Sequence, residues 1–345
     1  MADIDNFMVN IDVNSKSVSP GKITRIAILA YPGCMPAQIF GITDVLTLSQ
    51  SLASKDNTAP PQDCSISIIG ISSLSIQLAG GYELRVKEPD GHYDLLIVPG
   101  LPATDSALLF AHLAKLKPEI NFIQGCYDQH CRIASVCLGA FLLAEAGLVS
   151  GRKISTAWAF ADIFASRYPD SVNHSHHVLV EDGSLISTGA VSSVFDLAMH
   201  LVEQIYGKAC ARLVGQITLL DSPRVSQRPY VNDELVRNLT PAFSRDVMLW
   251  LERHLSEPFD LARLANAFHI SQRTLTRRIK NETGKSPLAL LQRQRVNKAK
   301  ELLSTTRLSL QSIVETVGYS DLPAFTRLFQ RHVNESPASF RKRHS

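Results

Sequence analysis

The last third of the chain contains two copies of one sequence unit, about fifty residues apart. The stretch "LARLANAFHIS", which begins at Leu261, aligns with "LQSIVETVGYS", which begins at Leu310, because apolar residues and a final serine recur 49 positions on. After a one-residue insertion, the pattern from Leu275 to Pro287 recurs 50 positions on, from Phe325 to Pro337. The tail is therefore predicted to contain two similar helical modules.

Each copy reads as an amphipathic helix, a short turn and a second helix. The second helix is expected to open at a serine suited to N-capping, which is Ser271 in the first copy and Ser320 in the second. The residues predicted to face the interior are Leu275, Ile279, Phe325 and Phe329. This layout is typical of a helix-turn-helix, whose second helix enters the major groove of DNA.

Polar and cationic residues occupy the outer face of both second helices. Arg277 and Arg327 have the side chain that binds guanine bidentately. Between the copies, "LALLQRQRVNKAKELLS" predicts a long basic helix that would hold the reading helices about one DNA turn, roughly 34 Å, apart. The alternative is a pair of ordinary solvated helical hairpins, which the gathering of cations on one face disfavours. The candidate DNA-contacting residues are Gln272, Arg273, Thr276, Arg277, Lys280, Asp321, Thr326, Arg327, Gln330 and Arg331.

The net charge of +3 is distributed unevenly along the 345 residues. Residues 1–240 carry 17 Lys and Arg against 23 Asp and Glu, a net charge of −6. Residues 241–345 carry 18 against 9, a net charge of +9. A basic module behind an acidic body indicates a polyanionic partner for the tail.

The front part of the chain alternates short apolar runs with helical patterns. The runs "RIAILAYPG", "SISIIGIS", "YDLLIVPG" and "RIASV" predict strands of a mainly parallel sheet covered by helices on both faces, a flavodoxin-like α/β fold. A hairpin is expected in "HHVLVEDGSLISTG" with Asp182 and Gly183 at its turn, followed by a helix over about Val191 to Tyr206. The tail, in contrast, is predicted to be all α-helical.

These patterns divide the chain into four predicted parts. The start has no basic region followed by an apolar block, so no signal peptide is predicted and a cytoplasmic protein is expected. The parts are a loose arm at 1–22, an α/β domain at 23–221, a proline-containing linker at 222–242 and a helical DNA-binding domain at 243–345.

Cys137 stands at a predicted strand-to-helix turn in "RIASVCLGAFLLAEAGLVSGRK". The free N–H groups of a helix start can lower the pKa of a thiol and can hold an oxyanion. Three interpretations are open for this residue: inert packing, a wall of an effector pocket, or a covalent nucleophile. The other cysteines, at 34, 64, 126, 131 and 210, have no spacing typical of a zinc site and are expected to be reduced.

A histidine-rich segment, "NHSHH", contains His174, His176 and His177. Three histidines suggest a metal site, but no carboxylate or thiol follows at a suitable spacing. The sequence therefore favours a solvated loop, and neither a metal nor another cofactor is expected.

In these motifs, the tail resembles the AraC/XylS-type transcriptional regulators from about Phe243 to Arg341. The resemblance includes "GYSDLPAFTRLFQRHVNESPASFR", with Asn334 where that family usually has glycine. The front domain resembles the PfpI-like branch of the class I glutamine-amidotransferase-like superfamily over residues 24–220, through "IVPG", "SVCLGAFLLAEAGLVSGRK", "STAW" and "STGAVSSVFDLAMHLV". The pairing is similar to a group of bacterial regulators and implies a front domain that senses a small molecule.

The resemblance also bears on catalysis at Cys137. Hydrolytic relatives have histidine after the cysteine, where this chain has Leu138, and many of the regulators have histidine where this chain has Ala157. Gln38 stands where an acidic residue is usual. A thiol without a base or an oriented partner is a poor nucleophile, so a non-catalytic front domain is expected.

The sequence thus predicts a ligand-responsive regulator that binds operator DNA as a homodimer through its front domain, with no membrane partner. One alternative is a cysteine hydrolase or amidase that uses Cys137 and carries a DNA-binding tail. Another is a front domain that only dimerises. The candidate effector-pocket residues are Gly100, Cys137, Leu138, Gly139 and Trp158.

Overall fold

The computed structural model describes residues 25–54, 64–220, 224–232 and 242–344. The predicted arm at 1–22 lies outside the described residues, as do large parts of the predicted linker. Among the described helices, none combines the length and the apolar character needed to cross a membrane.

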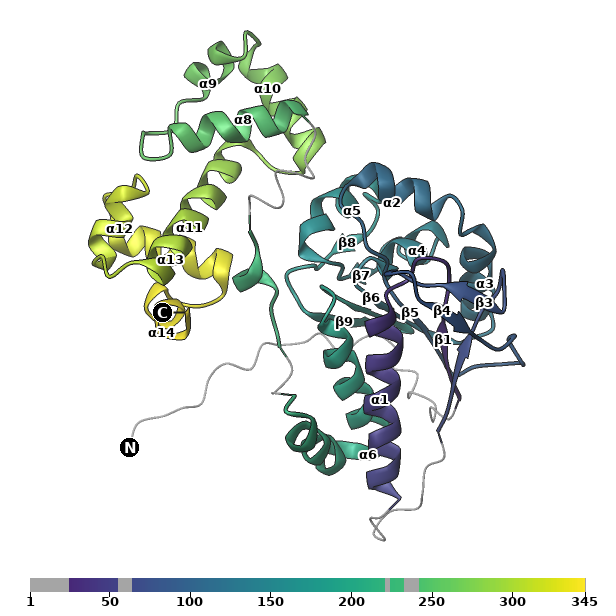
Figure 1. Cartoon of the computed structure of the whole chain (residues 1–345). Helices are drawn as coiled ribbons and strands as arrows, with labels where there is room; N and C mark the ends of the chain where they lie inside the picture. Colours follow the sequence, from purple (N-terminus) through teal and green to yellow (C-terminus); the bar gives the residue numbers. More distant parts are fainter. Residues whose placement is uncertain (1–24, 55–63, 221–223, 233–241, 345) are drawn as a thin grey trace, which may run out of the picture.

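A six-stranded sheet forms the centre of the front domain (Figure 1). The strand order is β2-β1-β5-β6-β10-β9, with every pair parallel except the edge pair of β10 and β9. All four predicted strands are confirmed, and the order of the five parallel strands is that of a flavodoxin-like fold. The strands are β1 (Arg25–Leu29), β2 (Ser65–Ile69), β5 (Leu95–Val98), β6 (Arg132–Val136), β9 (Leu179–Asp182) and β10 (Leu185–Thr188).

Helices cover both faces of this sheet, as predicted. Figure 1 shows α1 and α6 on one side and α2 to α5 on the other. Two short sheets lie beside the main one, β3 (Ser75–Gln77) with β4 (Glu83–Arg85) and β7 (Lys153–Ile154) with β8 (Val172–Asn173). The helices are α1 (Pro36–Ala53), α2 (Ser106–Leu113), α3 (Lys117–Asp128), α4 (Gly139–Glu145), α5 (Ala161–Arg167) and α6 (Ser193–Thr218), with a 3-10 turn, η1, at Trp158–Phe160.

The predicted hairpin is present, but its turn is one residue further on than expected. Asp182 pairs with Leu185, so Gly183 and Ser184 form the two-residue loop, and Gly183 has a φ of 63° that suits glycine. The following helix starts at Ser193 and continues past Gly207, where the backbone leaves helical geometry with a φ of 84°. The predicted helix end near Tyr206 is therefore an interruption, after which a second helical segment follows.

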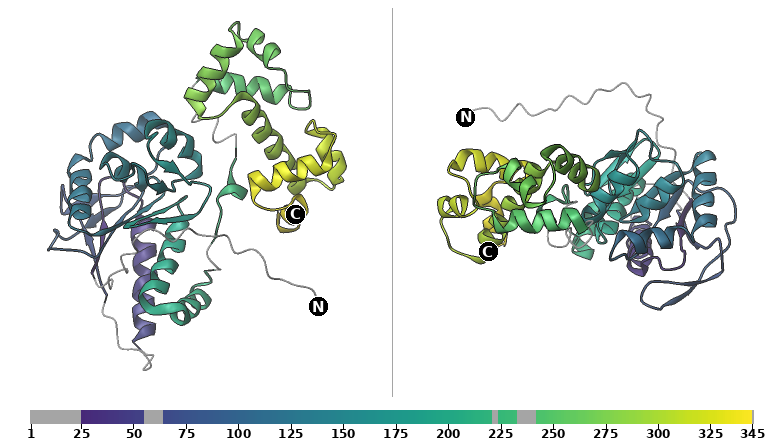
Figure 2. Two further views of the ribbon diagram at one scale, coloured as in Figure 1. Left: turned by 180° about the vertical axis from the view of Figure 1, so that it is seen from behind. Right: turned by 90° about the horizontal axis from the view of Figure 1, so that it is seen from above.

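The tail is all helical, as predicted, and contains two hydrophobic cores that share one helix. The first half of α11 packs in one core through Leu290 and Leu291, and its second half packs in the other through Val296 and Leu303. Figure 2 shows α11 running from one helical unit to the other. The helices are α8 (Ala242–Arg253), α9 (Leu261–Ala267), α10 (Gln272–Thr283), α11 (Pro287–Thr305), α12 (Leu310–Thr316), α13 (Leu322–Val333) and α14 (Pro337–His344).

The caps of the two second helices differ in one respect from the prediction. Ser271 caps α10, and its side chain accepts a hydrogen bond from the Thr274 N–H, as expected. The prediction of Ser320 as the second cap is wrong, because Asp321 caps α13 and accepts from the Ala324 N–H. The one-residue insertion between the repeats falls before this cap, so the helix begins one position later.

Candidate functional site

The outer faces of α10 and α13 form the candidate DNA-reading surface. Leu275, Ile279, Phe325 and Phe329 are fully buried, which confirms the predicted inner face of both helices. The remaining face is thereby turned outward on both helices. Of the ten candidate DNA-contacting residues, Thr276 and Thr326 are half-buried and the other eight are exposed.

One side chain of α11 contacts both helical units. Arg295, on α11, is 6% exposed and donates to the Leu255 carbonyl at 2.8 Å and to the Glu257 carbonyl at 2.5 Å in the first unit. Its guanidinium also lies over the Tyr319 ring of the second unit, 5.0 Å from the centroid. At about 1.5 Å per residue, the 19 residues of α11 span about 28 Å, close to one DNA turn of roughly 34 Å.

The elbow, which we define as residues 136–139, is the turn from β6 into α4. Cys137 has a φ of 56° there, a left-handed conformation that is unusual for a residue with a side chain. A Cβ on Gly139 would lie 2.4 Å from the Val98 carbonyl oxygen, so only glycine fits beneath the turn. The elbow is therefore the strand-to-helix turn expected from the sequence, and the left-handed backbone at Cys137 is a further finding.

The surroundings of the Cys137 thiol keep it protonated. Burial, which outweighs hydrogen bonds from the Leu138 backbone and the Gln38 side chain, raises the pKa of the Cys137 thiol to about 12. Gln38 is itself fully buried, and its side-chain oxygen accepts a hydrogen bond from the Gly100 N–H at 2.6 Å. Neither Leu138 nor Gln38 can take a proton from the thiol at neutral pH, so the elbow lacks a thiolate and a base.

The structure places four of the five candidate effector-pocket residues in or against the elbow and the fifth at a pocket between the domains. Gly100, Cys137, Leu138 and Gly139 are all buried in the packing of the elbow. Trp158 is half-buried and instead lines a pocket of about 260 Å³ between the front domain and the helical tail. The other polar and charged residues lining this pocket are Asp162, Asn173, Ser175, His176, Arg228, Lys285, Arg293, Asn297 and His332.

A carboxylate of the front domain meets two cations of the tail at this pocket. Asp162, on α5, accepts hydrogen bonds from the Lys285 ammonium group and, at 3.3 Å, from the Arg293 guanidinium. Burial acts to raise the pKa of Asp162, but the two cations together hold it below its usual value. We call this the Asp162 contact; it joins residues more than one hundred positions apart, so the sequence carried no signal for it.

The described part of the linker contacts both domains. Gln227 is 3% exposed, and its side-chain nitrogen donates to the Thr156 carbonyl at 2.9 Å and to the Ser175 carbonyl at 2.7 Å. Its side-chain oxygen accepts from the Ala190 N–H at 3.0 Å and the Trp158 N–H at 3.3 Å. An isolated glutamine in a segment with little periodicity gives no sequence signal, and this site was missed.

The turn that follows Gln227, η2 (Arg228–Tyr230), contacts the tail. Arg228 donates to the Arg331 carbonyl of α13 at 2.9 Å, and Lys300 of α11 donates to the Val231 carbonyl at 2.7 Å. In addition, α10 contacts α5. Both candidate reading helices therefore touch the front domain or the linker.

Comparison with known proteins finds a matching family model for part of each domain. Residues 264–343 match the family model described as a helix-turn-helix domain, and residues 43–204 match the DJ-1/PfpI family. The HTH-type transcriptional regulator GbdR of Pseudomonas aeruginosa is 23% identical over 229 residues, which covers 66% of this chain and 62% of GbdR. The HTH-type transcriptional regulator GlxA of Rhizobium meliloti is 27% identical over 215 residues, which covers 61% of this chain and 65% of GlxA.

A third relative matches a shorter region at higher identity. The HTH-type transcriptional activator RhaS of Escherichia coli is 37% identical over 110 residues, which covers 31% of this chain and 40% of RhaS. The chain thus spans less than two thirds of the length of each of these relatives. Its two matched regions are nevertheless distinct and follow the two domains of the structure: the front domain is similar to the DJ-1/PfpI family, and the tail is similar to a helix-turn-helix domain.

Proposed function

We propose that this chain is a sequence-specific, DNA-binding transcription regulator of the cytoplasm whose front domain has no catalytic role. The observation that carries the proposal is the arrangement of the tail, in which two capped helices with buried inner faces present cationic outer faces and share the long helix α11. Helices presented in this way fit two successive segments of the major groove. The relatives named as transcriptional regulators support the same function.

In the proposed complex, Arg277 and Arg327 read bases while the other exposed cations of α10 and α13 contact phosphates. Asp321 is assigned a different role, because its carboxylate caps α13 and a free carboxylate would repel the DNA backbone. The parts of the protein are proposed to be a DNA-binding domain at 243–345, a linker at 222–242 and a sensor domain at 23–221, preceded by an arm at 1–22.

Base reading is tested with Arg277→Ala and Arg327→Ala on DNA selected from a random pool by the wild-type protein. Each variant is expected to weaken binding to selected DNA by about 1 to 3 kcal/mol, because a bidentate contact to guanine is lost. Binding to random DNA should change less. Arg245→Ala, an exposed arginine on α8, is the matched control, and equal losses on selected and random DNA would refute direct reading.

The competing function is hydrolysis of an amide or ester by Cys137. A thiol with a pKa of about 12 is almost wholly protonated at neutral pH, and its hydrogen-bonding partners are not bases. We therefore expect no turnover on a panel of amides and esters. Turnover by the purified chain that is lost in Cys137→Ser would overturn the proposal of a non-catalytic domain.

We further propose that the effector binds in the pocket beside Trp158 rather than at the buried elbow. The pocket is lined by the cations Arg228, Lys285 and Arg293, so a small anionic or zwitterionic metabolite suits it. Such a ligand would contact Trp158 of the front domain and Lys285 and Arg293 of the tail together, so it would favour the docked arrangement of the two domains. A thermal-shift screen of anionic metabolites on the full chain tests this, with Trp158→Ala as the variant that should lose the shift.

Release of the contact is proposed to favour DNA binding. The front domain touches α10, the linker touches α13, and residues 1–240 carry a net charge of −6 that opposes DNA. The docked arrangement should therefore bind DNA less tightly than an undocked one, and an effector acts by its differential affinity for the two. We also propose that the chain is a homodimer through its front domain, which light scattering of the purified protein tests.

A further inference from the structure

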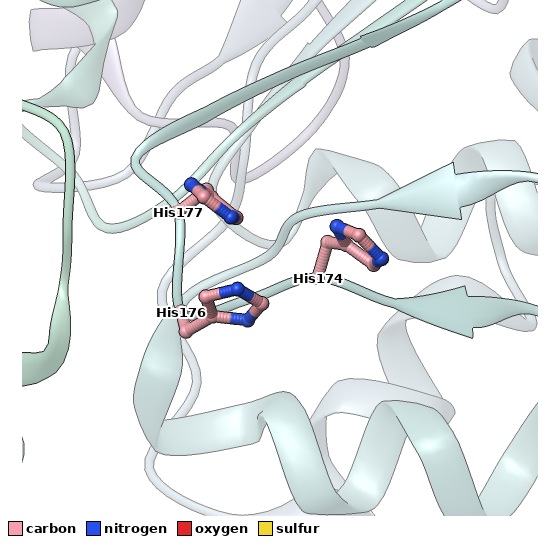
Figure 3. A group of neighbouring side chains, drawn as sticks. All are labelled: His174, His176 and His177. Carbon is pink, nitrogen blue, oxygen red and sulfur yellow. The ribbon is translucent and has the colours of Figure 1, made fainter. Parts of the chain in front are cut away.

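Three histidine side chains gather directly after β8. Figure 3 shows His174, His176 and His177 grouped beside one another on the segment that leaves this strand. The ring centroids of His176 and His177 are 4.1 Å apart. The ring centroid of His174 lies 5.4 Å from that of His176 and 5.9 Å from that of His177. One nitrogen from each ring can be chosen so that all three lie within 4.8 Å of one another.

This spacing is close to what a metal ion needs. Metal-to-nitrogen distances of about 2.0 to 2.1 Å in tetrahedral sites place neighbouring ligand nitrogens roughly 3.3 Å apart. Each ring would have to move by about an ångström or less toward a common centre. Such a movement requires only side-chain rotation, because all three residues are half-buried rather than locked in the core.

The backbone of the segment, in contrast, is held in place. The His174 N–H donates to the Ile154 carbonyl at 2.7 Å, and the His177 N–H donates to the His174 carbonyl at 2.9 Å. The His176 carbonyl accepts from the Gln227 N–H at 2.9 Å. The three side chains are therefore presented from a preformed turn, which lowers the entropic cost of assembling a site.

The ring nitrogens themselves are available. Within the described parts of the chain, no protein group forms a hydrogen bond with a ring nitrogen of these three histidines. A ring nitrogen without a proton carries the lone pair that a metal ion requires, so these side chains can act as ligands.

We propose that His174, His176 and His177 bind a first-row divalent transition-metal ion, such as Zn²⁺, Co²⁺, Ni²⁺ or Cu²⁺. Imidazole nitrogen suits these ions, whereas Mg²⁺ and Ca²⁺ prefer oxygen ligands. Three protein ligands leave at least one position for water or a small anion. Spacing along the sequence favoured a solvated loop; the convergence of the rings in the fold is what favours a site.

The proposed metal site lies beside the pocket between the domains and next to the linker. His176 lines the pocket between the domains, and its carbonyl and that of His177 accept hydrogen bonds from Gln227 of the linker, at 2.9 and 3.2 Å. A bound ion would thus lie at the junction of the sensor domain and the linker. The proposal does not depend on DNA binding, and its test uses no DNA.

The test measures metal uptake by the full-length chain without an affinity tag. After chelation, equilibrium dialysis against micromolar Zn²⁺ or Co²⁺ should give one ion per chain in the wild type. His174→Gln and His177→Gln should each weaken uptake by about tenfold or more, since loss of even an outer-shell partner costs about 10 to 100-fold. His92→Gln, an exposed histidine of the same domain, is the matched control and should bind as the wild type does.

A second measurement keeps the proposal testable if the variants fold poorly. Modification of histidines in the wild-type protein by diethyl pyrocarbonate, mapped by mass spectrometry, should be suppressed by Zn²⁺ in the peptide that contains residues 174–177 and not at His92. Failure of the wild type to take up either ion overturns the proposal. Uptake that is equal in the wild type and both ligand variants, or equal protection of His92, overturns it as well.

Discussion

Removal of the Asp162 carboxylate is the most direct perturbation of the coupling between the two domains. Asp162→Asn keeps the size of the side chain and removes the negative charge that faces Lys285 and Arg293. The Asp162 side chain is 29% exposed, and those of Lys285 and Arg293 are 31% and 12% exposed. The contact therefore lies between a solvated ion pair and a buried one.

This intermediate burial sets the expected magnitude. Exposed ion pairs contribute about 0 to 1 kcal/mol, and breaking a buried pair costs about 3 to 5 kcal/mol. We expect the variant to weaken docking of the two domains by about 1 to 3 kcal/mol, which is a change of about 5 to 150-fold in the docking equilibrium. The affinity for selected DNA should rise, because more of the protein is in the undocked arrangement. The rise cannot exceed a factor of one divided by the undocked fraction of the wild-type protein.

Hydrogen exchange measured by mass spectrometry reports docking, and fluorescence anisotropy with selected DNA reports affinity. In Asp162→Asn, exchange should increase in α5 and in the described linker residues 224–232, while the central strand β5 should not change. Asp170→Asn is the control, because it makes the same charge change at an exposed position of the same domain. If the two variants exchange and bind DNA alike, the Asp162 contact does not control docking and the reasoning fails.

Three further outcomes are expected. Gln227→Ala should lower the free energy of unfolding by about 1 to 3 kcal/mol, because the backbone groups that the Gln227 side chain pairs with lose these hydrogen bonds. A denaturant titration in which Gln227→Ala matches the wild type would contradict this. Cys137 should resist alkylation in the folded protein at pH 8, because a pKa of about 12 leaves almost no thiolate at that pH. The thiolate fraction becomes substantial only as the pH approaches the pKa. Rapid labelling of Cys137 in mapped peptides at pH 8 would show that the elbow opens. Asn334→Ala should destabilise the tail by about 1 kcal/mol whereas Asn334→Gly should not, since the residue has a φ of 66° at the end of α13. Thermal melts in which both variants behave alike would argue against this cap.

Local patterns in the sequence were sufficient to predict most of the fold. Near-continuous apolar runs that alternate with helical patterns are typical of strands covered on both faces, so they predicted the parallel sheet. The 49 to 50-residue repeat, with its apolar positions at helical spacing, placed Leu275, Ile279, Phe325 and Phe329 inward and the cations outward. Asn334, which stands where the resembled family usually has glycine, has a φ of 66°, a conformation that asparagine tolerates. The wrong N-cap, at Ser320 instead of Asp321, arose because the position of a one-residue insertion is set by packing.

The sequence by itself thus determined the sheet, the two helical units, the outward face of each reading helix and the absence of histidine next to Cys137. Tertiary structure decided what depends on residues distant along the chain: the burial that raises the pKa of Cys137, the contact of Asp162 with Lys285 and Arg293, and the insertion of Gln227 into the front domain. It also decided that the three histidine rings converge. The physical reason is that periodicity and turn chemistry act over a few residues, whereas burial, charge pairing and ligand geometry depend on which segments the fold brings together.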